Sequence, residues 1–351
     1  MPLKTYGVLK GRAVERQVEK DDNSPHFQVH IVADGQDFRL AINVRSVQAP
    51  FDLLYFVNDN FQHPIVDRLA KLNSGFNKIQ QSDRKAGGIA LDYIRGNLFD
   101  VTQMKPLPFN KPGADNDLNE VIDLYIQRAI ATEDADIYAF GESWGPEDKR
   151  DKIFGFLPGN GIHDIHMNQG SSGKFQKDNG VYQDGGLMIH FPSRNQWVAA
   201  FFAFQSQSFH TDDIQGNPLP DVPGQPLPLP DGPGQPPETV PLPDGKVRII
   251  AALVNPPGDD PGKESVTLIN TSPDRVDLNG WALADSLKRK SPLKDISLAP
   301  GALVTVPLTG KDIQLGNNGG IITLLDRQGT KIDGVSYTKD AAKKQGWTIV
   351  F

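Results

Sequence analysis

The chain has 351 residues, a length that suits two domains better than one. Hydrophobic residues make up 38% and charged residues 23%, proportions typical of folded rather than disordered chains. The net charge of −7 argues against a nucleic-acid binder that is basic over its whole length, although it permits a local basic patch. Without cysteine the chain cannot form disulfides, Cys-ligated zinc or iron–sulfur sites, or a thiol nucleophile.

Neither a membrane span nor a secretion signal is expected. No apolar run approaches the roughly 18 residues that a membrane-spanning helix needs. The first residues, Met-Pro-Leu-Lys-Thr-Tyr, lack the hydrophobic segment of a signal peptide. We therefore expect a cytoplasmic protein.

The N-terminal part, residues 1–214, predicts both strands and helices. Period-2 alternation and turn residues indicate strands at 6–14, 27–32, 38–44, 136–140, 162–167, 186–191 and 197–205. Helical periodicity appears at 51–55 and 63–72. It is strongest at 117–131, where Asp117 can cap the helix and Glu120 follows three residues later. These elements predict a mixed α/β (α+β) domain.

Four segments of this part carry a family resemblance. They are Tyr6-Gly-Val-Leu-Lys-Gly, Leu91-Asp-Tyr-Ile-Arg-Gly-Asn-Leu-Phe-Asp, Tyr138-Ala-Phe-Gly-Glu-Ser-Trp and Gly161-Ile-His-Asp-Ile-His-Met-Asn-Gln-Gly. Over residues 1–214 the chain resembles the YukJ family of bacterial proteins. The resemblance implies no particular chemistry, so the chemistry is argued from the residues.

Residues 163–170 are unusually rich in polar side chains for a predicted strand. The segment contains His163, His166, Asn168 and Gln169 and runs into a Gly-Ser-Ser-Gly loop whose amides could hold an anion. The predicted hairpin adds His26 and His30. A pair of histidines with amide groups suits phosphodiester cleavage, in which one imidazole acts as base or nucleophile and the other as acid.

This reasoning selects the candidate site residues. The catalytic candidates are His166, His163, Asn168, His26 and His30. The substrate-binding candidates are Gln169, with Arg95 as a phosphate partner.

The same residues are loosely similar to the paired His-x-Lys motifs of the phospholipase D superfamily. His26-x-Gln28 is followed by Asn43, and His166-x-Asn168 forms the second piece. Gln28 and Asn168 replace both lysines, which puts that relationship in doubt.

A bound metal is the alternative mechanism. The imidazoles and carboxylates of the first 214 residues are numerous enough to bind a divalent ion, but they do not identify a ligand set. No metal ligand is therefore assigned, and the cofactor is left open. The residues considered for a metal are His163, His166, His190, His210, Asp184 and Asp212.

Residues 215–245 separate the two halves of the chain. They contain eleven of the 28 prolines, no Lys or Arg, and a repeated Leu-Pro-Asp-Gly. Proline cannot donate the backbone hydrogen bonds that helices and sheets need, and this composition favours an extended spacer. An alternative is a ligand for an SH3-like partner.

The C-terminal part, residues 246–351, predicts an all-β domain. Short β-rich runs alternate with turn signals, a spacing typical of a sandwich. The segments Ser265-Val-Thr-Leu-Ile-Asn-Thr-Ser, Leu278-Asn-Gly-Trp and Asp333-Gly-Val-Ser-Tyr occur in the order seen in lamin-tail domains, which this part resembles. The resemblance implies an immunoglobulin-like sandwich that attaches an enzyme to a partner, a surface or nucleic acid. Its basic loop, Lys288-Arg289-Lys290, is a candidate phosphate contact.

Two classes of function follow. The first is a phosphodiester hydrolase, a nuclease or phosphodiesterase, with nucleic acid as the expected substrate and the C-terminal domain as a targeting module for a protein partner. The second is a non-enzymatic binding or scaffold protein with two recognition domains on a proline-rich tether. A carbohydrate-active or surface protein is a third, weaker alternative.

Overall fold

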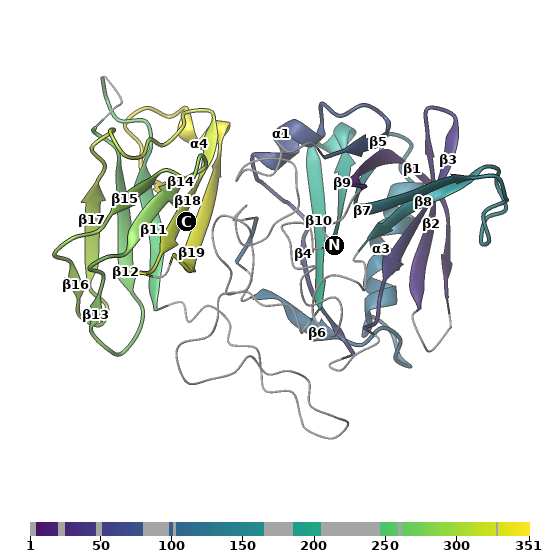
Figure 1. The fold of residues 1–351 in the computed structure, drawn as a ribbon, viewed down its shortest axis with the longest axis horizontal. Coiled ribbons are helices and arrows are strands. Elements are labelled where there is room, and N and C mark those ends of the chain that lie inside the picture. The colour runs from purple at the N-terminus through teal and green to yellow at the C-terminus, as the bar shows by residue number, and fades with distance from the viewer. Residues whose placement is uncertain are drawn as a thin grey trace.

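The computed structural model describes residues 5–19, 25–46, 51–79, 98–100, 103–164, 185–204, 246–258, 262–327 and 329–351. Its strands form two units, one built from residues before position 205 and one from residues after position 245 (Figure 1). The expected spacer at 215–245 lies outside the described residues. Among the residues described, no helix is long and apolar enough to cross a membrane.

The first unit is built on one large sheet. In the described part of the chain this sheet has ten strands in the order β5-β1-β2-β3-β8-β7-β9-β10-β4-β6. An additional pairing between β1 and β7 closes β1, β2, β3, β8 and β7 into a barrel. The strands are β1 (Tyr6–Val18), β2 (His26–Ala33), β3 (Gln36–Asn43), β4 (Leu53–Asn58), β5 (Gly75–Lys78), β6 (Lys105–Leu107), β7 (Asp136–Glu147), β8 (Gly159–Asp164), β9 (Gly185–Phe191) and β10 (Gln196–Phe204).

This unit is mostly β, with a barrel, and differs from the α/β (α+β) domain that the sequence predicts. Its described α-helices are α1 (Ile65–Leu69) and α3 (Leu118–Ile130). The helix expected at 51–55 is wrong, because that segment enters strand β4, which pairs with the phenylalanine-rich β10. A continuous run of apolar, aromatic and β-branched residues suits a strand buried against another strand better than an amphipathic helix.

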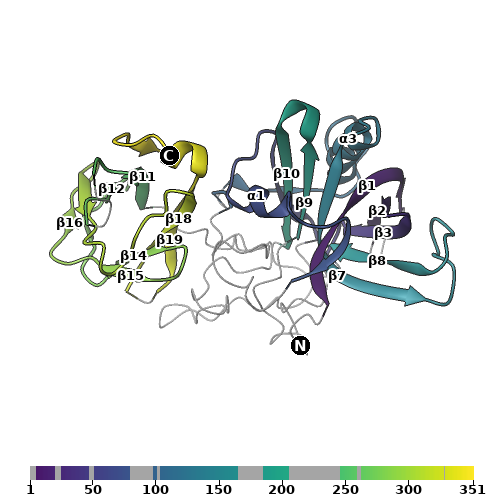
Figure 2. The same ribbon diagram turned by 90° about the horizontal axis from the view of Figure 1, so that it is seen from above.

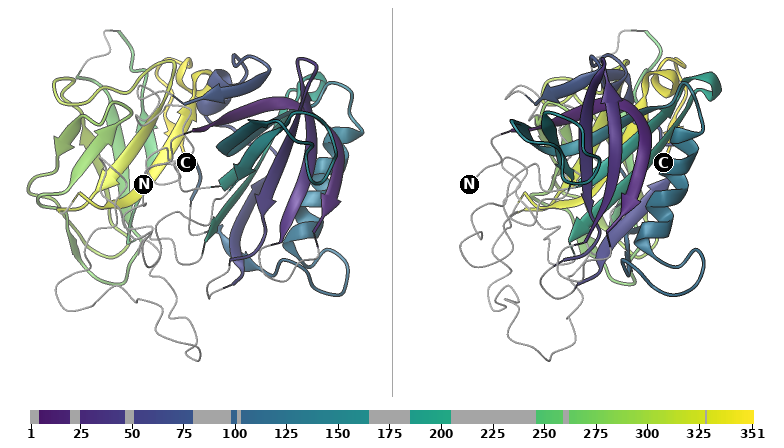
Figure 3. Two further views of the ribbon diagram at one scale, coloured as in Figure 1. Left: turned by 45° about the vertical axis from the view of Figure 1, so that its right-hand side comes forward. Right: turned by 90° about the vertical axis from the view of Figure 1, so that its right-hand side faces the viewer.

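Helix α3 begins where the sequence predicts. The side chain of Asp117 accepts a hydrogen bond from the backbone N–H of Glu120 at 2.9 Å and caps the helix. Leu118, Ile122 and Ile126 on one helical face are buried with the strands' apolar side chains. Figure 3 shows α3 lying along one side of the strands.

Alternation along the strands separates the core from a polar face. Phe27, Val29 and Ile31 of β2 are fully buried in the core that α3 covers. A second apolar cluster, which includes Tyr138, Phe140 and residues of α1, lies on the opposite side of the sheet. Successive side chains of a strand point to opposite faces. The remaining residues of β2 and β3 therefore form a polar face on the outside of the barrel.

The second unit has its own apolar core. Its two larger sheets can be followed in Figure 2. Within its described residues the sheets have the orders β17-β12-β11-β20 and β15-β14-β18-β19, beside a small β13-β16 pair. This β-rich arrangement is consistent with the immunoglobulin-like sandwich, and Trp281 packs against its core. The elements are β11 (Val247–Leu253), β12 (Ser265–Asn270), β13 (Val276–Asp277), β14 (Ala282–Asp285), β15 (Lys290–Pro292), β16 (Ser297–Leu298), β17 (Leu303–Pro307), β18 (Gly319–Leu325), β19 (Lys331–Thr338), α4 (Lys339–Ala342) and β20 (Ile349–Val350).

Candidate functional site

The polar face of the barrel brings distant parts of the chain together. Strands β2 and β3 pair antiparallel, so that His26 lies across from Asn43 and Gln28 across from Ala41. Strand β8 adds in parallel on the other side of β3 and places His163 beside Ala41. Because the alanine side chain is small, residues of β2 and β8 can approach one another over it.

A pair of histidines is the central feature of this face. The Nε2 atoms of His26 and His163 lie 2.7 Å apart, and their ring centroids are 4.7 Å apart. Both side chains are partly buried. At this separation the two nitrogens form a hydrogen bond, in which one carries the proton and the other accepts the bond.

Glu19, just beyond the end of β1, lies beside His26. One of its carboxylate oxygens lies 3.4 Å from Nδ1 of His26 and accepts a hydrogen bond from the backbone N–H of the same residue at 3.2 Å. An ionised carboxylate can only accept, so its position favours the tautomer of His26 that carries its proton on Nδ1. In that tautomer, Nε2 of His26 is the acceptor and Nε2 of His163 is the donor.

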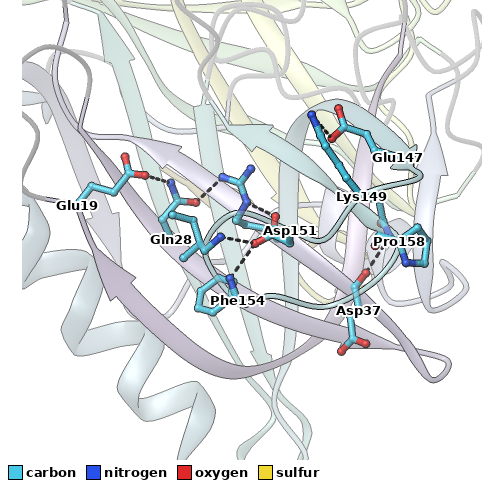
Figure 4. Close-up of polar contacts among 11 residues, drawn as sticks. Glu19, Gln28, Asp37, Glu147, Lys149, Asp151, Phe154 and Pro158 are labelled. Carbon is cyan, nitrogen blue, oxygen red and sulfur yellow. Dashed lines mark hydrogen bonds and ion pairs between the residues drawn. The ribbon is translucent and has the colours of Figure 1, made fainter.

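A chain of polar contacts continues from Glu19 across the face (Figure 4). The Gln28 amide donates to the other Glu19 oxygen at 3.0 Å and accepts from Nη1 of Arg39 at 3.0 Å. Nε of Arg39 donates to Asp151 at 2.7 Å. Asp151 lies in the loop between β7 and β8, so the hairpin that carries His163 also anchors the far end of the chain of contacts.

Asp151 is held as a carboxylate. Burial pushes its pKa upward, but hydrogen bonds from the backbone N–H groups of Phe154 and Ile153 and from Arg39 outweigh burial and hold the pKa below its usual value. The resulting charge keeps the buried guanidinium of Arg39 in place.

Trp144 of β7 borders the same face. Its ring lies edge-on to His163 at a centroid distance of 6.3 Å, and the guanidinium of Arg39 lies 4.7 Å from the ring centroid. Gly161 makes this packing feasible, because a Cβ there would lie 2.0 Å from the carbonyl oxygen of Arg39 and 2.4 Å from the indole ring. Glu142, two residues before Trp144 on β7, lies directly across from His163 of β8 in the strand register. Its carboxylate accepts a hydrogen bond from the hydroxyl of Thr5 at 3.2 Å.

The structure places the predicted site residues unequally. It brings His26 and His163 into contact. His30 does not join them; its Nε2 lies 2.8 Å from Asp37, and its ring stacks on Phe154 and Phe156 at 5.2 Å each. His166, Asn168, Gln169 and Arg95 lie outside the described residues.

The basic loop belongs to the second unit. Arg289 donates to Asp285 through Nε at 2.7 Å, and Lys290 begins β15. Lys288 adopts a left-handed turn conformation with a φ of 63°. Arg289 therefore has a structural role within its own loop.

No metal centre is formed by the residues that the structure describes. Within the ranges that the structure describes, no three His, Asp or Glu side chains are grouped so that they could hold a metal ion.

Sequence reasoning missed the residues that support the histidine pair. Alternation in His26-Phe-Gln28-Val-His30 indicates that Gln28 shares a face with His26, which is a usable signal. Glu19, Arg39 and Asp151 gave no comparable signal, because their contacts join segments far apart in the sequence.

Comparison with known proteins identifies both units. Residues 1–216 match a family model described as "Uncharacterized conserved protein (DUF2278)", and residues 242–339 match the Lamin Tail Domain. The chain is similar to "Uncharacterized protein YukJ" of Bacillus subtilis (strain 168), with 45% identity over 224 residues. That alignment covers 63% of this chain and 96% of the relative. The chain belongs to the DUF2278 (YukJ-like) family and carries a lamin tail domain after its family region.

Proposed function

We propose that the family region is a phosphodiester hydrolase whose chemistry is carried by His26 and His163. The observation that carries the proposal is the 2.7 Å contact between their Nε2 atoms, with Glu19 behind His26. Hydrolysis of a phosphodiester needs a group that takes a proton from water and a group that gives one to the leaving oxygen. Two adjacent imidazoles, one neutral and one protonated, supply both once the substrate has separated their Nε2 atoms, which bond to each other in the unliganded chain.

The roles follow from the position of Glu19. The carboxylate stabilises the imidazolium that forms when Nε2 of His26 takes a proton from the attacking water. The water oxygen then bonds to phosphorus. The bond from phosphorus to the leaving oxygen breaks, and that oxygen receives the proton from Nε2 of protonated His163. The products are a phosphomonoester and an alcohol.

The contact between the two rings also explains how the pair recovers. After one turnover His26 carries the extra proton, and Nε2 of His163 lacks one. Once the products leave, the proton returns from His26 to His163 across the 2.7 Å contact. The site is then ready for another substrate without exchanging a proton with solvent.

The remaining candidates have supporting roles in this proposal. Arg95, Asn168 and Gln169, together with His166, are the groups that would hold the phosphate and stabilise its negative charge. The lamin tail domain would direct the enzyme to nucleic acid or to a protein partner, with the loop around Lys288 and Lys290 as its phosphate contact.

The test is hydrolysis by the full chain. Single-stranded DNA, double-stranded DNA, RNA and bis(4-nitrophenyl) phosphate are each incubated with EDTA or with magnesium, manganese or zinc. We expect cleavage of the nucleic acids to fall about a hundredfold or more in both His26→Asn and His163→Asn, and cleavage of bis(4-nitrophenyl) phosphate to fall by this factor in His26→Asn, since general acid–base groups contribute factors of this size.

His190→Gln is the matched control, because His190 is also a half-buried strand histidine but stacks on Trp197 away from the pair. If the rate of His26→Asn or His163→Asn falls only in proportion to its folded fraction, measured by thermal melting, the proposal is contradicted. Absence of hydrolysis under every condition favours the binding or scaffold function instead. Activity that requires an added metal assigns a metal-dependent mechanism.

A further inference from the structure

Gln28 occupies an unusual position between two charged side chains. Its side chain is buried, with a residue exposure of 1%, and lies between the Glu19 carboxylate and the Arg39 guanidinium. Both ends of its amide are used, the NH₂ group by Glu19 and the carbonyl oxygen by Arg39. Because the same buried amide bonds to both groups, the position of the carboxylate depends on the position of the guanidinium.

The orientation of this amide is fixed by its neighbours. Arg39 has donors only, so the carbonyl oxygen of Gln28 must face it and the NH₂ group must face Glu19. Rotating the amide by half a turn would oppose NH₂ to a guanidinium and oxygen to a carboxylate. Arg39 itself is held by Asp151, whose carboxylate also accepts two backbone N–H groups.

Glu19 is held in turn by what surrounds its two oxygens. Gln28 donates to one oxygen, and the backbone N–H of His26 donates to the other. The second oxygen also faces Nδ1 of His26 at 3.4 Å. If Gln28 did not hold the first oxygen, the carboxylate could rotate away from the imidazole and no longer select its tautomer.

We propose that Gln28 is a positioning residue, which holds Glu19 so that His26 keeps its proton on Nδ1 and presents an unprotonated Nε2 to His163. The effect on the rate rests on the proposed hydrolase function. The effect on the tautomer does not, because it belongs to the unliganded protein. The two consequences can therefore fail separately.

The experiment measures imidazole ¹⁵N shifts in the full chain without substrate, and hydrolysis rates beside them. In the wild type His26 should show a protonated Nδ1 and an unprotonated Nε2. Gln28→Met has a similar length but cannot donate to Glu19, so His26 should show a mixture of tautomers. Hydrolysis should fall about tenfold to a hundredfold, the range seen when the hydrogen-bond partners of metal-binding histidines are removed.

Gln196→Met is the matched control. Gln196 also donates its amide to an oxygen of another segment, the carbonyl of Asp59 at 2.7 Å, but it lies on β10 outside the chain of contacts. Both the tautomer of His26 and the rate should stay unchanged in this variant.

Glu19→Gln tests the same proposal if Gln28→Met does not fold. Glu19 is at the more exposed end of the chain of contacts and its substitution leaves the Arg39–Asp151 pair intact. It should also release His26 into a mixture of tautomers.

A single Nδ1-protonated tautomer in folded Gln28→Met or in Glu19→Gln overturns the positioning role. A tautomer change in a chain without any hydrolytic activity supports the positioning role and rejects the hydrolase.

Discussion

His190 shows how one buried side chain couples stability to pH. It lies on β9 across from Trp197 of β10, and the two rings stack with centroids 4.3 Å apart. Burial lowers the pKa of His190 below its ordinary value, and Lys10 acts in the same direction. Asp136, its neighbour on β7, opposes them only in part. The folded protein therefore favours the neutral imidazole.

The lowered pKa predicts a loss of stability in mild acid. As pH falls below about 6.5, the unfolded chain binds a proton at this histidine before the folded chain does. The free energy of unfolding contributed by neutral His190 is therefore present at pH 7.5 and declines toward the lower folded pKa. His190→Phe keeps the stacking on Trp197 and removes the titration.

Denaturant unfolding at pH 7.5 and pH 5.5 measures this effect. The decrease in unfolding free energy between the two pH values should be smaller in His190→Phe than in the wild type. Equal decreases in the two proteins would show that His190 titrates normally.

Single residues also show the limits of prediction at the site. His26 and His163 were selected from the sequence because imidazoles and amides cluster around each of them. Their contact arises from the parallel pairing of β3 with β8, which no local pattern encodes. Arg39 and Asp151 look like ordinary surface charges in the sequence, yet both are buried and paired with each other.

At the scale of elements, local signals predicted the parts of the fold that depend on local physics. The cap at Asp117 and the apolar face that follows predict α3, because both operate within a few residues. Alternation predicts the hairpin of β2 and β3 for the same reason.

Other elements could not be predicted in this way. Closure of the barrel depends on β1 pairing with β7, where Tyr6 lies opposite Glu142. Such pairing is decided by the whole sheet. The helix prediction at 51–55 is wrong for the same reason, because strand β10, far away in the sequence, provides the apolar partner against which β4 forms.

At the scale of the whole molecule, the two units have separate cores. The apolar cluster of the second unit is formed entirely by residues after position 245. A contact between the units is the ion pair of Arg248 with Asp100 at 2.7 Å, and Arg248 also lies 3.3 Å from Asp333. A partly exposed ion pair of this kind contributes about 0–1 kcal/mol by itself.

Separate cores predict that residues 1–214 and 246–351 fold independently. Because residues 215–245 contain no Lys or Arg, trypsin cannot cut there, and a protease of broad specificity is the suitable reagent. We expect two stable fragments. The 246–351 fragment should melt at the same temperature as the second unit melts within the full chain. Asp100→Asn should leave that temperature nearly unchanged.

If the 246–351 fragment is unfolded, the second unit needs the first. The same follows if the full chain shows one calorimetric transition that disappears when the chain is cleaved.

The central claim is that His26 and His163 act as base and acid on a phosphodiester. Its most direct test compares two substrates that differ in leaving group. Bis(4-nitrophenyl) phosphate releases a stable anion that needs no proton, whereas a dinucleoside phosphate releases an alkoxide that does. The measurement is kcat/KM for the full-length wild type, His26→Asn and His163→Asn on both substrates.

The account predicts that His26→Asn loses activity on both substrates, because the attacking water always needs a base. His163→Asn should lose about a hundredfold more activity on the dinucleoside phosphate than on bis(4-nitrophenyl) phosphate, because only the first needs its acid. Equal losses on the two substrates in His163→Asn would contradict the account. Unchanged activity of folded His26→Asn on either substrate, or of folded His163→Asn on the dinucleoside phosphate, would also contradict it.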